Sequence, residues 1–313
     1  MSGTGLTLWN RWSPVLRWGG TAAGIAYIVH VIDPRAATAA FGRISLAAMV
    51  LAIVLVGLNV VAGAMRWRVL LSAYGADTRP SFWRATKLYF IAFFYNNYLP
   101  GAVAGDVVRG VVTRDVFGER GATAGLAVVL VERALGLFGV FLLLAIGVAM
   151  ATIDTDSLWI WSVIGIAGSL ALVLALPFAR RLAPMLPGKL RLIAERVPEL
   201  SSASAFAVAA IYSVATQLFV TLAGWVLLRA IDPSVDLGSA LLIIPLAAAT
   251  TFLPFTVGGA GAREGVYIWL GASLFGMAKA DAVAASLALW LAHLINGAVG
   301  GVLQITERRR VMK

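Results

Sequence analysis

The chain alternates between long apolar stretches and short polar connections, and this alternation predicts helices that cross a membrane. A helix of about 20 apolar residues spans the hydrocarbon core of a bilayer. Six stretches approach or exceed that length, the first only with its flanking residues: 18–32, 44–65, 121–151, 158–178, 204–228 and 282–304. We therefore predict an all-α integral membrane protein with about six full transmembrane helices.

Two further apolar segments, at 82–114 and 238–277, are interrupted by polar, proline and glycine residues. Non-helical backbone at membrane depth is tolerated only where protein or a water-filled cavity surrounds it. Each segment is therefore predicted to be a re-entrant hairpin of two half-helices. The prolines would end the first half-helices, while the glycines permit positive φ and close backbone approach. The residues predicted at these turns are Pro100, Gly101 and Gly105, and Pro254, Gly258, Gly259 and Gly261.

The two interrupted segments share a spacing, because each has a Gly five residues and an Arg nine residues after its Pro. The matching residues are Pro100, Gly105 and Arg109, and Pro254, Gly259 and Arg263. Three predicted spans separate the copies, so the second enters from the opposite face. Inverted repeats with broken helices near the bilayer midplane are typical of transporters. We expect a single domain over 1–313, with inverted halves at about 15–178 and 204–305 joined by a cytoplasmic segment at 179–203.

The distribution of positive charge predicts how the chain is oriented. Residues are 60% hydrophobic and 13% charged, unlike those of a soluble domain. Most of the 25 Lys and Arg lie in connections on one side of the predicted topology, among them Arg66 and Arg68 after the second span. Cytoplasmic loops carry such an excess, which predicts cytoplasmic N- and C-termini in a bacterial inner membrane. The net charge of +10 thus reflects topology, and nucleic acid is not an expected partner.

The composition also excludes several kinds of chemistry. The chain has no Cys and only two His, which excludes thiol catalysis and a multi-His metal centre. We expect no metal, no cofactor and no catalytic residues. His293 shares a helix face with Asn296, and hydrogen bonding between helices is the favoured interpretation of both residues.

Ionisable side chains within or beside the apolar segments are the candidate substrate-binding residues, because each costs about 2.5–3.5 kcal/mol to insert at mid-membrane. Asp106 and Arg109 stand three residues apart, so a helix would place them on one face. Arginine binds phosphate oxygens bidentately, which makes these arginines candidates for a lipid phosphate, with the acids as counter-charges. Structural salt bridges that hold the hairpins in the bundle are the alternative. The candidates are Asp106, Arg109, Glu132, Arg133, Arg263 and Glu264, together with Asn97.

Three sequence blocks carry a resemblance to a known family: NNYLPGAVAGDVVR at 96–109, VLVERALGL around Glu132 and Arg133, and LPFTVGGAGAREG at 253–265. Together they resemble the hallmark blocks of the transmembrane flippase domain of lysyl-phosphatidylglycerol synthases, over about residues 15–305. The resemblance implies a lipid flippase of the free-standing type, which lacks the aminoacyl-transferase domain. It therefore does not imply that lysyl-phosphatidylglycerol is the substrate.

The leading hypothesis is a flippase or transporter, not an enzyme, that moves a phosphate-bearing, aminoacylated, glycosylated or isoprenoid lipid through a central charged cavity. A non-transporting scaffold in lipid or envelope biogenesis is one alternative. A membrane glycosyltransferase is another, with Asp154 and Asp156 as metal-binding acids in a short loop. Membrane lipids are the expected partners, while a homo-oligomer and a lipid-synthesising enzyme partner are left open.

Overall fold

The computed structural model describes residues 18–19, 21–26, 28–30, 32–99, 104–112, 116–117, 121–150, 156–252 and 259–311. Within these ranges the regular structure is helical throughout, with no strand. The predicted all-α class is therefore confirmed. The predicted turn residues Pro100, Gly101, Pro254 and Gly258 lie outside the described residues.

Four helices in the described part of the chain are long and apolar enough to cross a membrane. They are α3 (Leu46–Ala73), α6 (Gly121–Met150), α10 (Ala203–Ile231) and α13 (Lys279–Val311). Each carries large apolar side chains on its outer surface, such as Leu46, Ile211 and Val302. Exposed apolar rows of this kind on a long helix suit contact with lipid. These helices confirm four of the six predicted spans and a multi-pass membrane protein.

The remaining two predicted spans correspond to less regular segments, so six spans stay a prediction. The first is a shorter apolar helix at Thr21–His30. The second is α7 (Asp156–Ala175), followed by a 95° bend between Val163–Ala175 and Ala179–Met185. Beyond it come short helices in the segment predicted to be cytoplasmic: η2 (Leu176–Phe178), α8 (Ala179–Leu182), η3 (Ala183–Met185) and α9 (Gly188–Arg196). The helix α2 (Pro34–Gly42) precedes α3.

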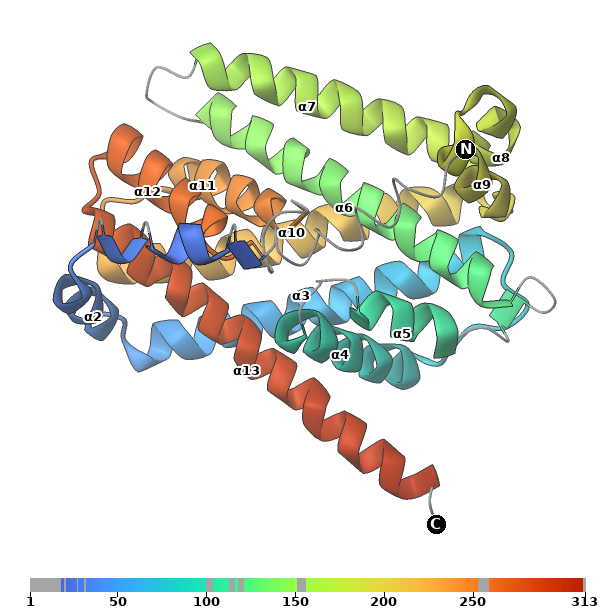
Figure 1. Ribbon diagram of the computed structural model, residues 1–313, viewed down its shortest axis with the longest axis horizontal. Helices are drawn as coiled ribbons and strands as arrows, with labels where there is room; N and C mark the ends of the chain where they lie inside the picture. The colour runs from blue at the N-terminus through green and yellow to red at the C-terminus, as the bar shows by residue number, and fades with distance from the viewer. Residues whose placement is uncertain are drawn as a thin grey trace.

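Each interrupted segment forms two helices rather than one. The first gives α4 (Phe82–Tyr98) and α5 (Ala104–Val112), and the second gives α11 (Leu237–Ala249), η4 (Thr250–Phe252) and α12 (Ala262–Phe275). The members of each pair pack against one another. Figure 1 shows that α4 and α5 approach the middle of the bundle from one end, and α11 and α12 from the other.

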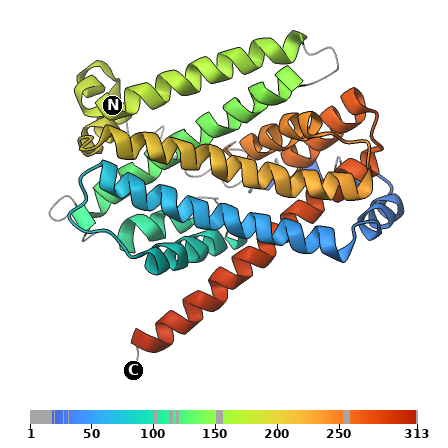
Figure 2. The same cartoon turned by 180° about the vertical axis from the view of Figure 1, so that it is seen from behind.

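The long helices α3 and α10 pack along each other and run in opposite directions, as Figures 1 and 2 show from two sides. Around this pair, α4 packs on α13 and α11 packs on α6. This packing forms the two larger apolar cores of the described chain. One surrounds Leu227, Ile244 and Tyr267, and the other surrounds Trp67 and Leu135.

Glycines allow the closest approaches between helices. At Gly105 this packing role replaces the predicted turn. Gly105 lies within α5 without a positive φ, and a Cβ there would overlap the carbonyl of Ala92 on α4. Its role is therefore close packing rather than a turn. Gly259 and Gly261 do have positive φ, of 79° and 85°, as predicted for the second break.

Candidate functional site

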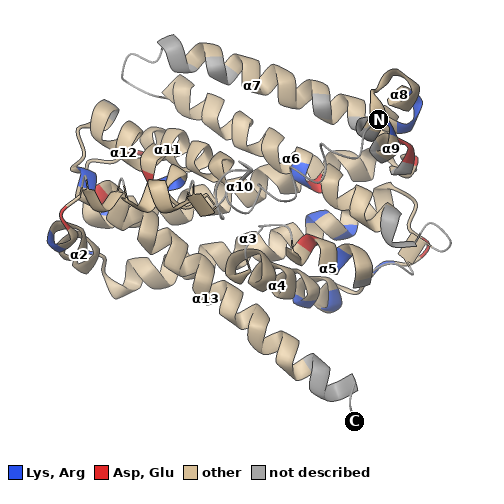
Figure 3. Ribbon diagram, in the orientation of Figure 1, with Lys and Arg blue, Asp and Glu red and all other residues tan. Residues whose placement is uncertain are grey.

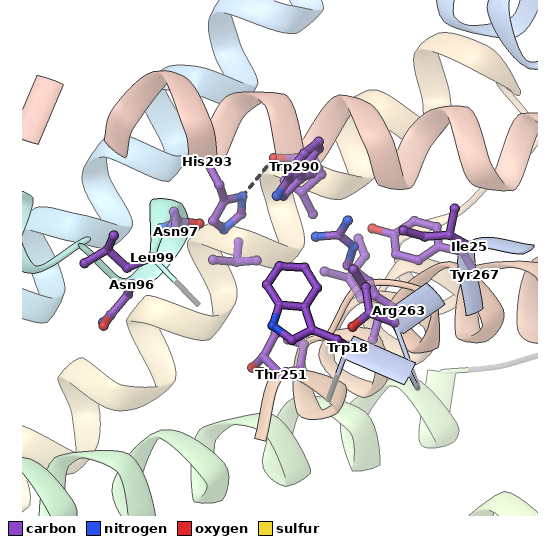
Figure 4. A pocket seen from close by; sticks show the side chains of 17 residues that line it. Trp18, Ile25, Asn96, Asn97, Leu99, Thr251, Arg263, Tyr267, Trp290 and His293 are labelled. Carbon is purple, nitrogen blue, oxygen red and sulfur yellow. Dashed lines mark hydrogen bonds between the residues drawn. The ribbon is translucent and has the colours of Figure 1, made fainter. Parts of the chain in front are cut away.

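A cavity of about 350 Å³ lies between the end of α4 and the start of α12. We call it the Arg263 cavity. Its walls bring together residues from both interrupted segments, from α10 and α13, and from the apolar helix near the N-terminus. Figure 4 shows its polar side chains, of which Asn97, Arg263, Tyr267 and His293 matter most below. Most of the remaining lining is apolar or aromatic, including Trp18, Leu99 and Trp290.

Arg263 is fixed in this cavity by three neighbours. Its Nε donates to Glu264 Oε1 at 2.8 Å and to Ser286 Oγ at 3.1 Å. The guanidinium also lies over the ring of Trp290, 5.9 Å from the ring centroid. The side chain retains 15% exposure and lines the cavity, so it can still meet a ligand. Arginine can hold several oxygens at once, so this geometry leaves capacity for an anion.

The backbone before Arg263 is shaped by glycine. The N–H of Gly261 donates to Glu264 Oε2 at 2.8 Å, which caps the first turn of α12. A Cβ on Gly261 would lie 2.7 Å from the Cα of Gly24, so only glycine lets the N-terminal helix approach this closely. The positive φ of Gly261, 85°, favours glycine independently, because a residue with a Cβ is strained in that backbone conformation. The glycine segment before α12 thus holds Arg263 at the start of that helix and closes one side of the cavity.

Asn97 and His293 are each fixed by the backbone of their own helix. Asn97 Nδ2 donates to the carbonyl of Phe93 at 2.8 Å, and His293 Nδ1 donates to that of Leu289 at 2.8 Å. The His293 ring also stacks on Phe93, with centroids 5.7 Å apart. Among the described residues, the predicted interhelical hydrogen bond is found for Asn296, which donates to Ile53 of α3 at 3.0 Å, and not for His293.

A second charged cluster is centred on Glu132 of α6. Its Oε1 accepts from Arg66 Nη2 of α3 at 2.9 Å and from Tyr89 of α4 at 2.8 Å. Its Oε2 accepts from Arg109 Nη1 of α5 at 2.9 Å. Figure 3 shows charged positions of α5 and α6 facing each other, with further Lys and Arg positions on the neighbouring α3 and α4. One carboxylate thus joins helices of the first interrupted segment to two long helices.

Asp106 extends this cluster to Arg133. Its Oδ1 accepts from Arg109 Nη2 at 2.6 Å, and its Oδ2 accepts from Arg133 Nε at 2.7 Å. The predicted placement of Asp106 and Arg109 on one helix face is confirmed. Asn96 connects the cluster to the cavity, because it lines the cavity and its Nδ2 lies 3.5 Å from Asp106 Oδ1.

The predicted site residues therefore fall into two groups. Asn97 and Arg263 line the cavity. Glu264 is not part of the lining, and it orients Arg263 through a hydrogen bond. The other four, Asp106, Arg109, Glu132 and Arg133, form the second cluster with one another. Arg109 and Glu132 are buried, and both are hydrogen-bonded to protein groups. That geometry is the structural salt-bridge arrangement that the sequence left open as an alternative for these residues.

Arg66 corrects one sequence-based assignment. Hydropathy ended the second span at 65 and placed Arg66 in a cytoplasmic loop, but α3 continues to Ala73 and Arg66 is buried. Its charge is compensated by Glu132, and its Nη1 lies 3.4 Å from both Ser213 Oγ and Thr216 Oγ1 of α10. An arginine that directly follows an apolar run can lie inside the membrane span, and it then requires an acid on a neighbouring helix.

Other residues of the site carried no signal in the sequence. Tyr267 and Trp290 look like ordinary apolar lining until the fold brings their helices together at the cavity. Ser286 and Tyr89 gain their roles only through contacts with Glu264 and Glu132.

The fold and the two charged clusters define a polytopic α-helical membrane protein with broken helices and a charged cavity inside its bundle. The chain belongs to the family of the lysylphosphatidylglycerol synthase TM region, whose model matches residues 15–301. This match confirms the family expected from the three sequence blocks. No curated protein matches the chain.

Proposed function

We propose that this protein is a lipid flippase in which a polar headgroup passes through the Arg263 cavity while the lipid tails stay in the surrounding bilayer. One observation supports this most directly. Among the described residues that line the cavity, Arg263 is the one formal charge, and apolar side chains form most of the rest. An anionic headgroup attached to apolar tails fits such a lining, because arginine can bind phosphate oxygens while the tails contact the apolar walls.

We propose further that the two halves form an inverted repeat that rocks about this cavity. In chain order, α3, the α4–α5 pair and α6 correspond to α10, the α11–α12 pair and α13. Under this correspondence, the packing of α4 on α13 has its counterpart in the packing of α11 on α6. Such symmetry lets one half move against the other, so that a central site faces either side in turn.

For orientation, we propose that the end carrying α8 and α9 faces the cytoplasm of a bacterial inner membrane, with both chain termini on that side. Arg180, Arg181 and Arg191 lie on these helices, and Arg79 and Arg84 precede or begin α4 at the same end. An excess of Lys and Arg in short loops is the usual mark of the cytoplasmic side.

Transport by the reconstituted protein tests this proposal. Purified protein in liposomes would be given fluorescent lipids with anionic, zwitterionic, aminoacylated or isoprenoid headgroups, and their movement between leaflets would be followed with an impermeant quencher. We expect Arg263→Gln to slow transport at least about tenfold, because a charged hydrogen bond is worth about 1.5–3 kcal/mol. Arg229→Gln is the matched control, since Arg229 also lies over a tryptophan, Trp225, but is exposed outside the cavity.

Two results would contradict the proposal. Normal transport by Arg263→Gln would remove the headgroup site, and no movement of any lipid by the parent protein would favour the scaffold alternative.

Alanine at both Asp154 and Asp156 should leave transport intact, because we propose transport without chemical conversion. Asp154 lies outside the described residues, and Asp156 begins α7.

A further inference from the structure

The chain changes direction sharply at the end of α7. The helical stretch Ala179–Met185 is bent by 95° from Val163–Ala175. Apolar side chains on α7 stay exposed up to its last turn, where Leu174 is 61% exposed. Such a surface suits lipid as far as Leu174, so a bend of this size directs the following chain along the surface of the bilayer. We call residues 176–200 the bent segment.

One face of the bent segment carries large apolar side chains that the bundle does not cover. Phe178, Leu182 and Met185 follow one another at helical spacing, and all three are exposed, Met185 by 82%. Arg181 belongs to the same face, because its Cζ lies 6.0 Å from the centroid of the Phe178 ring. In water this face would leave apolar area uncovered, whereas at a bilayer surface it can enter the boundary between headgroups and acyl chains.

The bent segment is held on the bundle by its smaller side chains. Ala183, Ala194 and Val197 are buried, and Val197 belongs to the core around Trp67. The helix α9 also packs on α6. Figure 1 shows α8 and α9 beside the end of α7, so the exposed apolar face is held where that helix ends.

The bent segment is also basic. It contains five Lys and Arg against two Glu, which gives a net charge of +3. Glu195 lies 2.8 Å from Arg191, and Glu199 lies 3.5 Å from Arg180, but both pairs are well exposed and such pairs contribute little. Figure 3 shows basic positions on α8. Positive charge therefore remains beside the apolar face even when both acids are counted, and it complements an anionic leaflet.

We propose that the bent segment is an interfacial element that lies on the bilayer and gathers anionic lipids around the end of α7. Phe178, Leu182 and Met185 enter the boundary of the acyl chains. Arg181 keeps its charge at the level of the lipid phosphates while its stem lies on apolar groups. An apolar face and a basic excess bind weakly when they act alone, and together they give stable attachment. None of the described residues of this segment lines the Arg263 cavity, so the inference does not rest on the proposed transport.

Quenching by brominated lipids tests the inference in the intact chain. The chain has no cysteine, so Met185→Cys can carry a single fluorophore. The protein would be reconstituted in one mixture of phosphatidylcholine and phosphatidylglycerol, with bromine on the acyl chains of either the first lipid or the second. We expect both to quench, and brominated phosphatidylglycerol to quench at least about twofold more strongly. Ser234→Cys, exposed between α10 and α11, is the control and should be quenched little by either lipid.

Matched charge variants of the Met185→Cys protein separate the two parts of the inference. Arg180→Gln combined with Arg181→Gln removes two charges from the bent segment and should bring quenching by the two lipids close to parity. Arg35→Gln combined with Arg229→Gln removes two exposed charges outside it and should leave the preference unchanged. Added salt should weaken the preference, because it screens exposed charges, but should not abolish quenching.

Each outcome supports or overturns the inference. No quenching at Met185→Cys would place this face in water or against a protein partner, and would overturn it. Equal quenching by the two brominated lipids would remove the selection of anionic lipid, as would an unchanged preference after loss of Arg180 and Arg181. Because none of these measurements requires a lipid to cross the membrane, failure here leaves the flippase proposal standing, and failure of transport leaves this inference standing.

Discussion

Arg66 of α3 and Glu132 of α6 form an ion pair 2.9 Å long, and their side chains are only 10% and 2% exposed. The same carboxylate also binds Tyr89 and Arg109, so it connects α3, α4, α5 and α6. Removing charges from water is costly unless partners compensate them; Glu132 compensates Arg66, and it shares Arg109 with Asp106. This residue should therefore matter more to the assembly of the first half than any other single acid.

Replacing Glu132 with Gln should strongly destabilise the protein. The amide keeps the shape of the side chain but leaves Arg66 and Arg109 without their shared counter-charge, and breaking a buried pair costs about 3–5 kcal/mol. Thermal unfolding in one detergent measures the change. Glu199→Gln is the control, because the Arg180–Glu199 pair is 3.5 Å long and well exposed, and such pairs contribute about 0–1 kcal/mol. Similar unfolding of both variants would contradict the central role of Glu132.

Tyr89→Phe should produce a smaller loss that isolates the hydroxyl of this residue. The change removes the hydroxyl that donates to Glu132 at 2.8 Å and accepts from Arg66 Nη2 at 3.3 Å, but keeps the ring under Arg109, 4.3 Å from its Cζ. A hydrogen bond to a charged group contributes about 1.5–3 kcal/mol. Tyr98→Phe, which loses a bond to the neutral carbonyl of Leu294, should cost only about 0.5–1.5 kcal/mol. The prediction fails if unfolding experiments give the reverse order.

Much of this framework follows from local sequence features. Long apolar runs specify α3, α6, α10 and α13, because crossing a bilayer requires length and apolarity above all. The spacing of Asp106 and Arg109 was enough to place both on one face, since helix geometry is local. Positive φ at Gly259 and Gly261 also follows from the clustering of glycine at the break.

What could not be predicted depends on contacts between distant segments. Arg66 looked like the start of a loop, because hydropathy cannot show that Glu132, 66 residues later, lies opposite it. The partition of the charged residues into a closed cluster and an open cavity depends on how α12 and α13 pack near α4. The meeting of His293 and Arg263 in one cavity depends likewise on how α12 and α13 pack against each other.

Gly105→Ala tests whether close packing, rather than a turn, explains this glycine. A Cβ at Gly105 would overlap the carbonyl of Ala92, so the two helices of the first pair must separate. Overpacking of this kind costs about 1–3 kcal/mol or more. Gly168→Ala in α7 meets no atom within 4 Å and removes a flexible residue from a helix, so it should be neutral or stabilising by up to about 1 kcal/mol. Equal stability of the two variants in thermal unfolding would refute the packing role.

The side of the membrane on which each interrupted segment begins and ends can be measured directly, because the chain contains no cysteine. Single cysteines at Arg79 and Glu119 flank the first segment in sequence, and cysteines at Ser234 and Ala278 flank the second. A membrane-impermeant maleimide would be applied to right-side-out and to inverted vesicles. If each segment enters and leaves on one side, the two members of a pair react in the same vesicles.

We expect Arg79→Cys and Glu119→Cys to react in inverted vesicles, and Ser234→Cys and Ala278→Cys in right-side-out vesicles. The cysteine-free parent protein gives the background. Members of one pair that react from opposite sides would mean that the segment crosses the membrane fully, which would remove the inverted repeat from the proposed mechanism. Both pairs on the same side would be equally damaging, because two broken segments that open toward one face cannot alternate access between two.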